Sequence, residues 1–113
     1  MLIKRNRLCK KKDFERVFKK GKGLKEDFLI LKMAKNNLSQ SRFGFIVGTK
    51  ISKKAVLRNK LKRRLRELVR GKIEKIKKGF DIVFITQPGL ENRDFWELEE
   101  ILNKIFNRAK LLK

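Results

Sequence analysis

Cationic side chains at helical spacing are the most concentrated chemistry in the sequence, and they lie between Lys53 and Arg70. Lys and Arg dominate this segment, KKAVLRNKLKRRLRELVR, and Glu67 is its single acidic residue. In a helix, like charges four residues apart repel by roughly 0.2–0.5 kcal/mol per pair. A polyanion along this surface would remove the repulsion and release its own counterions. The segment therefore indicates nucleic-acid binding, whereas a merely solvated helix face would balance its bases with acids.

Leucines at helical spacing provide the stripe that would hold this helix in place. They are Leu57, Leu61, Leu65 and Leu68. Such a stripe can pack against a sheet and leave the opposite side of the helix exposed. Ser52 is expected to cap the start of the helix, and Gly71 to end it.

Most other chemistries are excluded by residue type. The chain has no histidine, which is the commonest general base. Cys9 is the only cysteine, so neither an internal disulfide nor a zinc site is expected, and no disulfide-linked partner either. Glu26 and Asp27 are adjacent, so on a strand they would point to opposite faces and could not share a metal. We expect no catalytic residue in this polypeptide.

Composition bounds the class of protein. The 113 residues carry a formal net charge of +21 from 33 Lys and Arg against 12 Asp and Glu, and 41% are hydrophobic. This length and hydrophobic content predict one folded domain over residues 1–113. The charge is typical of proteins that work with a polyanion bound. No long apolar run or secretory signal is apparent, so no membrane association and a cytoplasmic location are expected.

Hydrophobic periodicity predicts the remaining elements. Helices are expected at residues 13–20 and after a cap at Asn92. Strands are expected at residues 24–34, 42–49 and 80–86. Together with the basic helix, the order is helix, two or three strands, helix, strand, helix. We therefore predict an α+β fold, a small two-layer sandwich with the order αβββαβα.

The segment from Gly48 to Glu67, GTKISKKAVLRNKLKRRLRE, resembles the signature of bacterial ribonuclease P protein subunits. DFERVFKKG near the start, DIVFI later and a closing amphipathic helix follow in that family's order. The resemblance covers nearly the whole chain. Its most specific part is a spacing of motif residues: Ala55, Val56, Arg58, Asn59, Lys62, Arg63 and Arg66.

The resemblance implies a basic protein that binds a catalytic RNA, with a left-handed βαβ crossover leading through the basic helix. Its partners would be the ribonuclease P RNA and precursor tRNA. The RNA would use Mg²⁺ to remove the 5′ leader, with no metal held tightly by the protein. RNA-subunit contacts carried over from the family motif are Arg58, Asn59, Lys60, Lys62, Arg63 and Arg66. The family usually has Arg where this chain has Lys60, and Lys lacks the bidentate fork of Arg.

The family also binds the single-stranded leader between its first helix and the open face of the sheet. The residues that match this cleft are Phe14, Phe18 and Leu31. Aromatic rings can stack unpaired bases without demanding a sequence, which suits leaders that vary between tRNA genes. Helical spacing alone favours Phe14 and Phe18 as ordinary core residues, and the resemblance balances this against a role in leader binding.

Two other functions share some of these features. A structural ribosomal or other RNA-binding protein would have the same size and charge, but would not need an exposed cleft with aromatic walls. A membrane-surface protein would need an exposed apolar face opposite the charges, whereas the leucine stripe is expected to pack on the sheet.

Overall fold

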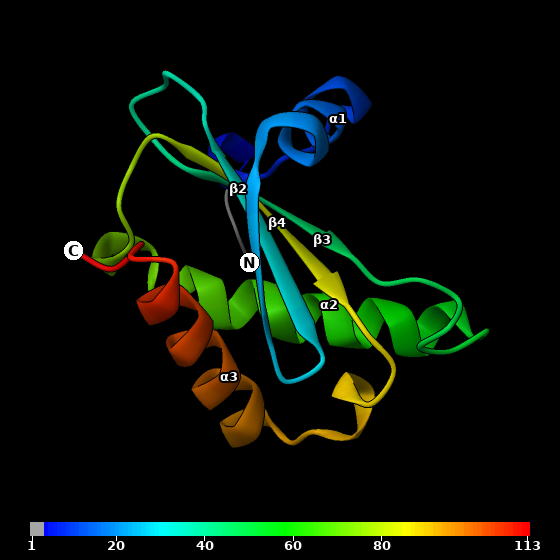
Figure 1. The fold of residues 1–113 in the computed structure, drawn as a ribbon. Helices are drawn as coiled ribbons and strands as arrows, with labels where there is room; N and C mark the ends of the chain where they lie inside the picture. The colour runs from blue at the N-terminus through cyan, green and yellow to red at the C-terminus, as the bar shows by residue number, and fades with distance from the viewer. Residues whose placement is uncertain (1–3) are drawn as a thin grey trace.

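The computed structural model describes residues 4–113 and has the predicted order of elements (Figure 1). The helices are α1 (Lys11–Lys20), α2 (Ala55–Arg70) and α3 (Phe95–Arg108). The strands are β1 (Lys22–Glu26), β2 (Leu29–Lys35), β3 (Arg42–Ile46) and β4 (Phe80–Thr86). Short 3₁₀ turns lie at Lys4–Asn6, Ile73–Lys75 and Leu90–Asn92. The prediction of a small α+β fold with the order αβββαβα is confirmed.

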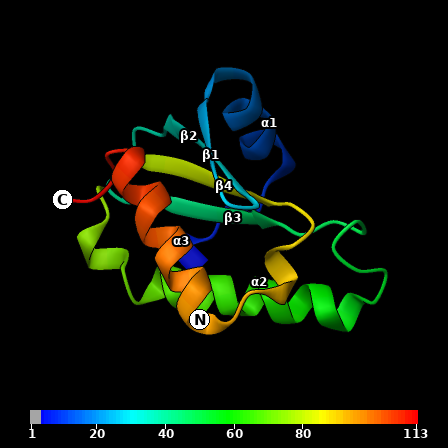
Figure 2. The same cartoon turned by 60° about the horizontal axis from the view of Figure 1, so that its bottom comes forward.

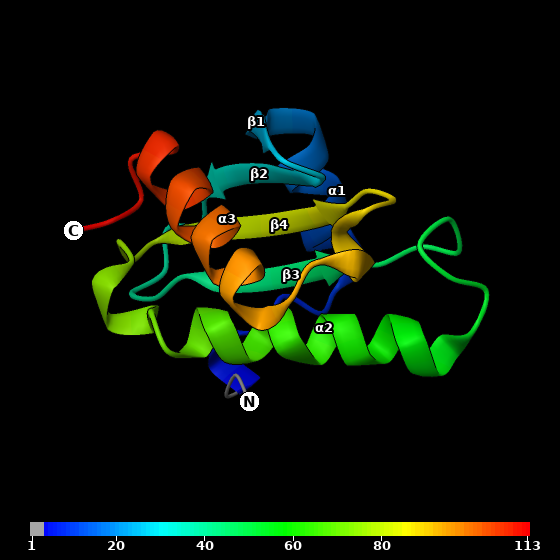
Figure 3. The ribbon, with the colours of Figure 1, turned by 90° about the horizontal axis from the view of Figure 1, so that it is seen from below.

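The four strands form one sheet in the order β1-β2-β4-β3. The β1–β2 and β2–β4 pairs are antiparallel, whereas β3 and β4 are parallel and joined through α2. Figure 3 views the sheet from the side that carries α2 and α3. When β3 and β4 are turned to point upward in this view, β4 lies to the left of β3, so the crossover is left-handed. This hand is rare among βαβ units.

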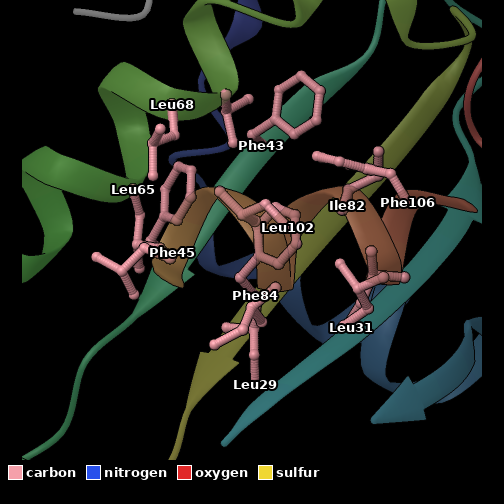
Figure 4. Packing of buried hydrophobic residues seen from close by; sticks show 14 of the residues in the cluster. Leu29, Leu31, Phe43, Phe45, Leu65, Leu68, Ile82, Phe84, Leu102 and Phe106 are labelled. Carbon is pink, nitrogen blue, oxygen red and sulfur yellow. The ribbon is translucent and has the colours of Figure 1, made fainter. Parts of the chain in front are cut away.

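Helices cover both faces of the sheet (Figure 2). The main core lies between the sheet and the pair α2 and α3, where the rings of Phe45, Phe84 and Phe106 contact one another in sequence (Figure 4). On the other face, α1 buries Val17 against Leu8 and Val83. The predicted two-layer sandwich is therefore the sheet with α2 and α3, and α1 crosses part of the opposite face.

Several element boundaries differ from the sequence prediction, and the strand expected at residues 42–49 already ends at Ile46. The expected strand at residues 24–34 is a hairpin, because Asp27 and Phe28 turn the chain with φ of 30° and 60°. Such two-residue turns normally carry Asn-Gly, so this one has no sequence signal. The last helix is capped by Asp94 instead of Asn92, and Asp94 forms a capping box with Glu97.

The basic helix also begins later than predicted. Its cap position is Lys54, which makes no side-chain capping bond, and α2 proper begins at Ala55. Ser52 instead accepts a hydrogen bond from the backbone N–H of Lys54, 3.1 Å away, and so orders the turn before the helix.

Candidate nucleic-acid interface

Three of the four predicted leucines hold α2 against the sheet. Leu61, Leu65 and Leu68 are buried, together with Val69, in the core that contains Phe43 and Phe45 (Figure 4).

Leu57 is 49% exposed, so its expected place in the buried stripe is wrong. The start of α2 extends past the end of β3, where the sheet offers no surface to cover it (Figure 3).

We define the α2 cationic surface as the six predicted RNA-subunit contacts: Arg58, Asn59, Lys60, Lys62, Arg63 and Arg66. Asn59, Lys60 and Arg63 are exposed, and the other three are half-buried. Within residues 4–113, none of its five cations forms an ion pair with a carboxylate. Arg58 donates from Nη1 to the backbone oxygen of Ser52 at 2.9 Å, which fixes its guanidinium at the start of the helix.

Four of the six residues of this surface line two hollows on α2. Asn59, Arg63 and Arg66 line one of them, together with Glu67. Lys60 and Arg63 line the other with Arg64, at the side where α3 begins. Glu67 borders both hollows and is ion-paired with Arg70 at 3.2 Å. Arg64 was not predicted from the sequence because it lies outside the family motif, although its charge and helical position were visible.

A second surface lies beside α1 on the opposite face of the sheet. We call it the α1-side sheet face and define it by Phe14, Phe18, Ile30, Lys32, Ile46 and Ile85. Phe18 is 38% exposed, and Nζ of Lys32 lies 5.7 Å from the centre of its ring. Phe14 is half-buried against the small core under α1. The three isoleucines are also half-buried, although α1 is the helix on this face.

Leu31 does not belong to this surface, so its prediction as a cleft wall is wrong. Its side chain is 0% exposed and lies in the main core beneath α3. Successive strand residues point to opposite faces, so Ile30 and Lys32 face α1 while Leu31 faces away. The sequence alternation alone did not specify which face would remain open.

A buried carboxylate fixes α1 over the sheet. Asp81 on β4 is fully buried, accepts 2.8 and 2.7 Å hydrogen bonds from Arg42 and a 2.9 Å bond from Asn36, and pairs with Arg16 of α1. Burial opposes the ionisation of Asp81, but the hydrogen bonds from Arg42 and Asn36 and the charges of Arg42 and Arg16 outweigh it. The pKa of Asp81 is therefore lowered. The Asp81 hydrogen bonds and charge raise the pKa of Arg42 against the effect of burial.

The described residues contain no group of three or more Cys, Asp or Glu side chains arranged to hold a metal. No helix among residues 4–113 is both long and apolar enough to cross a membrane. The structure thus presents a row of cations along α2 on one side of the sheet and a partly apolar, aromatic surface on the other.

Known proteins are similar to this chain in both sequence and fold. The family model described as Ribonuclease P matches residues 2–110. The ribonuclease P protein component of Thermotoga maritima is 41% identical over 111 residues, covering 95% of this chain and 94% of its own length. That of Alkaliphilus metalliredigens is 36% identical over 107 residues, covering 95% and 96%.

Solved structures agree. The ribonuclease P protein of Staphylococcus aureus superposes with a TM-score of 0.88 at 28% identity, covering 96% of this chain and 98% of its own. That of T. maritima, in complex with 1-(4-fluorophenyl)-2-thiourea, gives 0.83 at 40% identity, covering 90% and 98%. With a family match that spans nearly all of the sequence and a fold shared with these proteins, the chain belongs to the ribonuclease P protein family.

Proposed function

We propose that this protein binds the RNA subunit of ribonuclease P through the α2 cationic surface. The observation that carries the proposal is the set of five cations on one helix with no carboxylate partner in residues 4–113. Each phosphate that they neutralise releases counterions from the RNA, which makes binding both favourable and salt-dependent. A membrane-surface role is disfavoured because three of the four leucines opposite these cations are buried.

The 5′ leader of precursor tRNA is the proposed ligand of the α1-side sheet face. Phe18 and the half-buried isoleucines offer apolar contact to unpaired bases, and Lys32 beside the Phe18 ring offers a charge for a phosphate. This surface makes few sequence-specific demands, as a protein that acts on many different leaders requires. A purely structural ribosomal protein would have no use for it.

Removal of the leader is proposed to be a reaction of the RNA subunit, which uses Mg²⁺ for hydrolysis. The protein lacks histidine, and its described carboxylates form no metal-binding group. Its contribution would be to hold substrate and ribozyme together, in the cytoplasm where precursor tRNA is processed.

The test is to add purified protein to a bacterial ribonuclease P RNA at low Mg²⁺ and to measure release of the leader from precursor tRNA. Stimulation is expected, because bound cations replace part of the metal that offsets phosphate repulsion. A heat-unfolded sample of the same protein serves as the control for charge alone. Absence of stimulation by the folded protein would favour the structural RNA-binding alternative.

A further inference from the structure

Two aromatic side chains at the start of α3 are exposed without an evident structural role. Phe95 and Trp96 are 43% and 76% exposed, and their rings meet edge to face with centroids 5.9 Å apart. Leu98 and Leu102, further along the same helix, are fully buried. A large exposed aromatic pair on a monomer is typical of an interaction site.

One member of this aromatic pair, Phe95, adjoins cations of α2. The ring of Phe95 lines a hollow with Lys60, Arg63 and Arg64, at the place where the start of α3 lies beside α2 (Figure 3). The acidic residue of that hollow, Glu67, is paired with Arg70. Aromatic rings next to unpaired cations are the combination that binds unpaired bases and their phosphates.

Two of the three acidic side chains of α3 line another hollow. Glu97 and Glu100 line a pocket with Asp27, at the β1–β2 turn. They are also paired, with Arg93 at 3.3 Å and Lys104 at 3.7 Å respectively. Phe95 thus has its cationic neighbours on the α2 side, and an RNA would approach from there.

We propose that Phe95 and Trp96 stack on an unpaired nucleotide of the ribonuclease P RNA, whose flanking phosphates contact Lys60 and Arg64. This inference rests on the proposed binding of that RNA by α2. The leader is not the expected ligand here, because Phe95 adjoins α2, whereas Phe14 and Phe18 lie across the sheet.

Trp96 is the only tryptophan of the chain, so its fluorescence reports on this site directly. The wild-type protein is titrated with ribonuclease P RNA while Trp96 emission and bound RNA are both measured. Stacking on a base is expected to quench the emission in step with binding. A duplex RNA of the same length provides the control for non-specific contact, since its bases are already stacked.

Variants measure the contribution of the ring. Trp96→Ala is expected to weaken RNA-subunit binding by about 5- to 150-fold, the range for loss of one stacked base. Trp96→Phe should retain most of the affinity. The salt dependence should keep the wild-type slope in both variants, because no charge is removed. Leu38→Ala is the matched control, since Leu38 is also an exposed apolar residue, in the β2–β3 loop. Thermal unfolding of each variant checks that it is folded.

Three results would overturn the inference. One is wild-type binding with unchanged Trp96 emission, and another is an affinity that Trp96→Ala leaves intact. The third is that the wild type forms a dimer and that Trp96→Ala converts it to a monomer without loss of RNA affinity. The aromatic pair would then be an interface with a second copy of this chain. A wild type that fails to bind the RNA at all would overturn the proposed function and this inference together.

Discussion

At the scale of single residues, the two proposed RNA surfaces differ in what they contribute. The cations of α2 contribute charge, whereas Phe18 contributes a ring with one nearby charge. Residue types and helical spacing predicted a cationic helix, and the family motif supplied the six proposed contacts of the first surface. Residue types and spacing did not predict the second surface, because local spacing does not show which face of β2 meets the main core. Leu31 lies in that core, whereas Ile30 lies on the face that carries α1.

Arg63 borders both hollows of α2, so its removal should affect RNA binding more than loss of an average surface charge. Arg63→Ala is expected to weaken binding of the RNA subunit and to lower the slope of log K against log salt by about 1 for each phosphate that the variant no longer neutralises. Filter binding over a range of salt concentrations measures this. Lys104→Ala removes one exposed charge at the opposite side of α3 and is the matched control. An unchanged slope would reject a phosphate contact for Arg63.

Phe18→Ala should distinguish leader binding from simple packing. Loss of a stacking ring is expected to weaken binding of precursor tRNA to the holoenzyme by about 1–3 kcal/mol and to leave mature tRNA unaffected. Comparison of the two dissociation constants measures this. Equal losses for both tRNAs would identify Phe18 as a structural residue.

Asp81→Asn should weaken the attachment of α1. The variant is expected to lose about 1.5–3 kcal/mol of unfolding free energy, the range for charge-assisted hydrogen bonds. A larger loss is not expected, because Arg16 and Arg42 are 30% and 23% exposed and water can solvate them. Urea unfolding measures the difference.

The pH dependence of that difference follows from the lowered pKa of Asp81. An ionised Asp81 contributes its full stability above the ordinary pKa near 3.8, and this contribution is lost as pH falls through the lower pKa of the folded state. Wild type and Asp81→Asn should therefore converge in stability at acid pH. A constant difference would show that the carboxylate charge does not stabilise α1.

At the scale of elements, periodicity predicted the type and order of nearly every helix and strand. The sequence did not reveal the β1–β2 turn, because Asp27 and Phe28 adopt positive φ without a glycine or asparagine to announce it. Tertiary contacts explain that turn: the backbone oxygen of Phe28 accepts a 2.9 Å hydrogen bond from Gln87, and its ring contacts Arg93. Such long-range partners cannot be recognised from local spacing.

The close packing of α1 against β3 depends on the absence of a side chain at Gly44. A Cβ at Gly44 would lie 2.5 Å from the ring of Phe14 and 3.4 Å from Cβ of Leu8. Gly44→Ala is therefore expected to destabilise the protein by about 1–3 kcal/mol, the range for overpacking. The hydrogen-exchange rates of the α1 backbone amides should be higher in Gly44→Ala than in the wild type.

Gly48→Ala is the control for this substitution, because a Cβ there meets no atom within 4 Å among the described residues. A smaller side chain in place of Phe14, in the variant Phe14→Leu, should restore part of the stability when combined with Gly44→Ala. If Gly44→Ala and Gly48→Ala had equal stabilities, close packing of α1 on β3 would be rejected.

At the scale of the whole molecule, the excess of positive charge opposes folding. With a formal net charge of +21, the native state repels itself, and added salt screens that repulsion. The melting temperature should therefore rise between about 0.02 M and about 0.5 M NaCl. Affinity for the RNA should fall over the same range. Calorimetry and filter binding measure the two trends, and a melting temperature that falls with salt would contradict the argument.

The sheet separates α2 from α1, and this arrangement has a consequence for the order of assembly. A ribozyme bound along α2 leaves the surface beside Phe18 accessible, so the two ligands need not compete. Because strands and their hydrogen bonds resist deformation, the spacing between the two would be constant from one substrate to the next. The protein would then hold every leader at the same distance from the bound ribozyme, and so align it with the scissile bond irrespective of its nucleotide sequence.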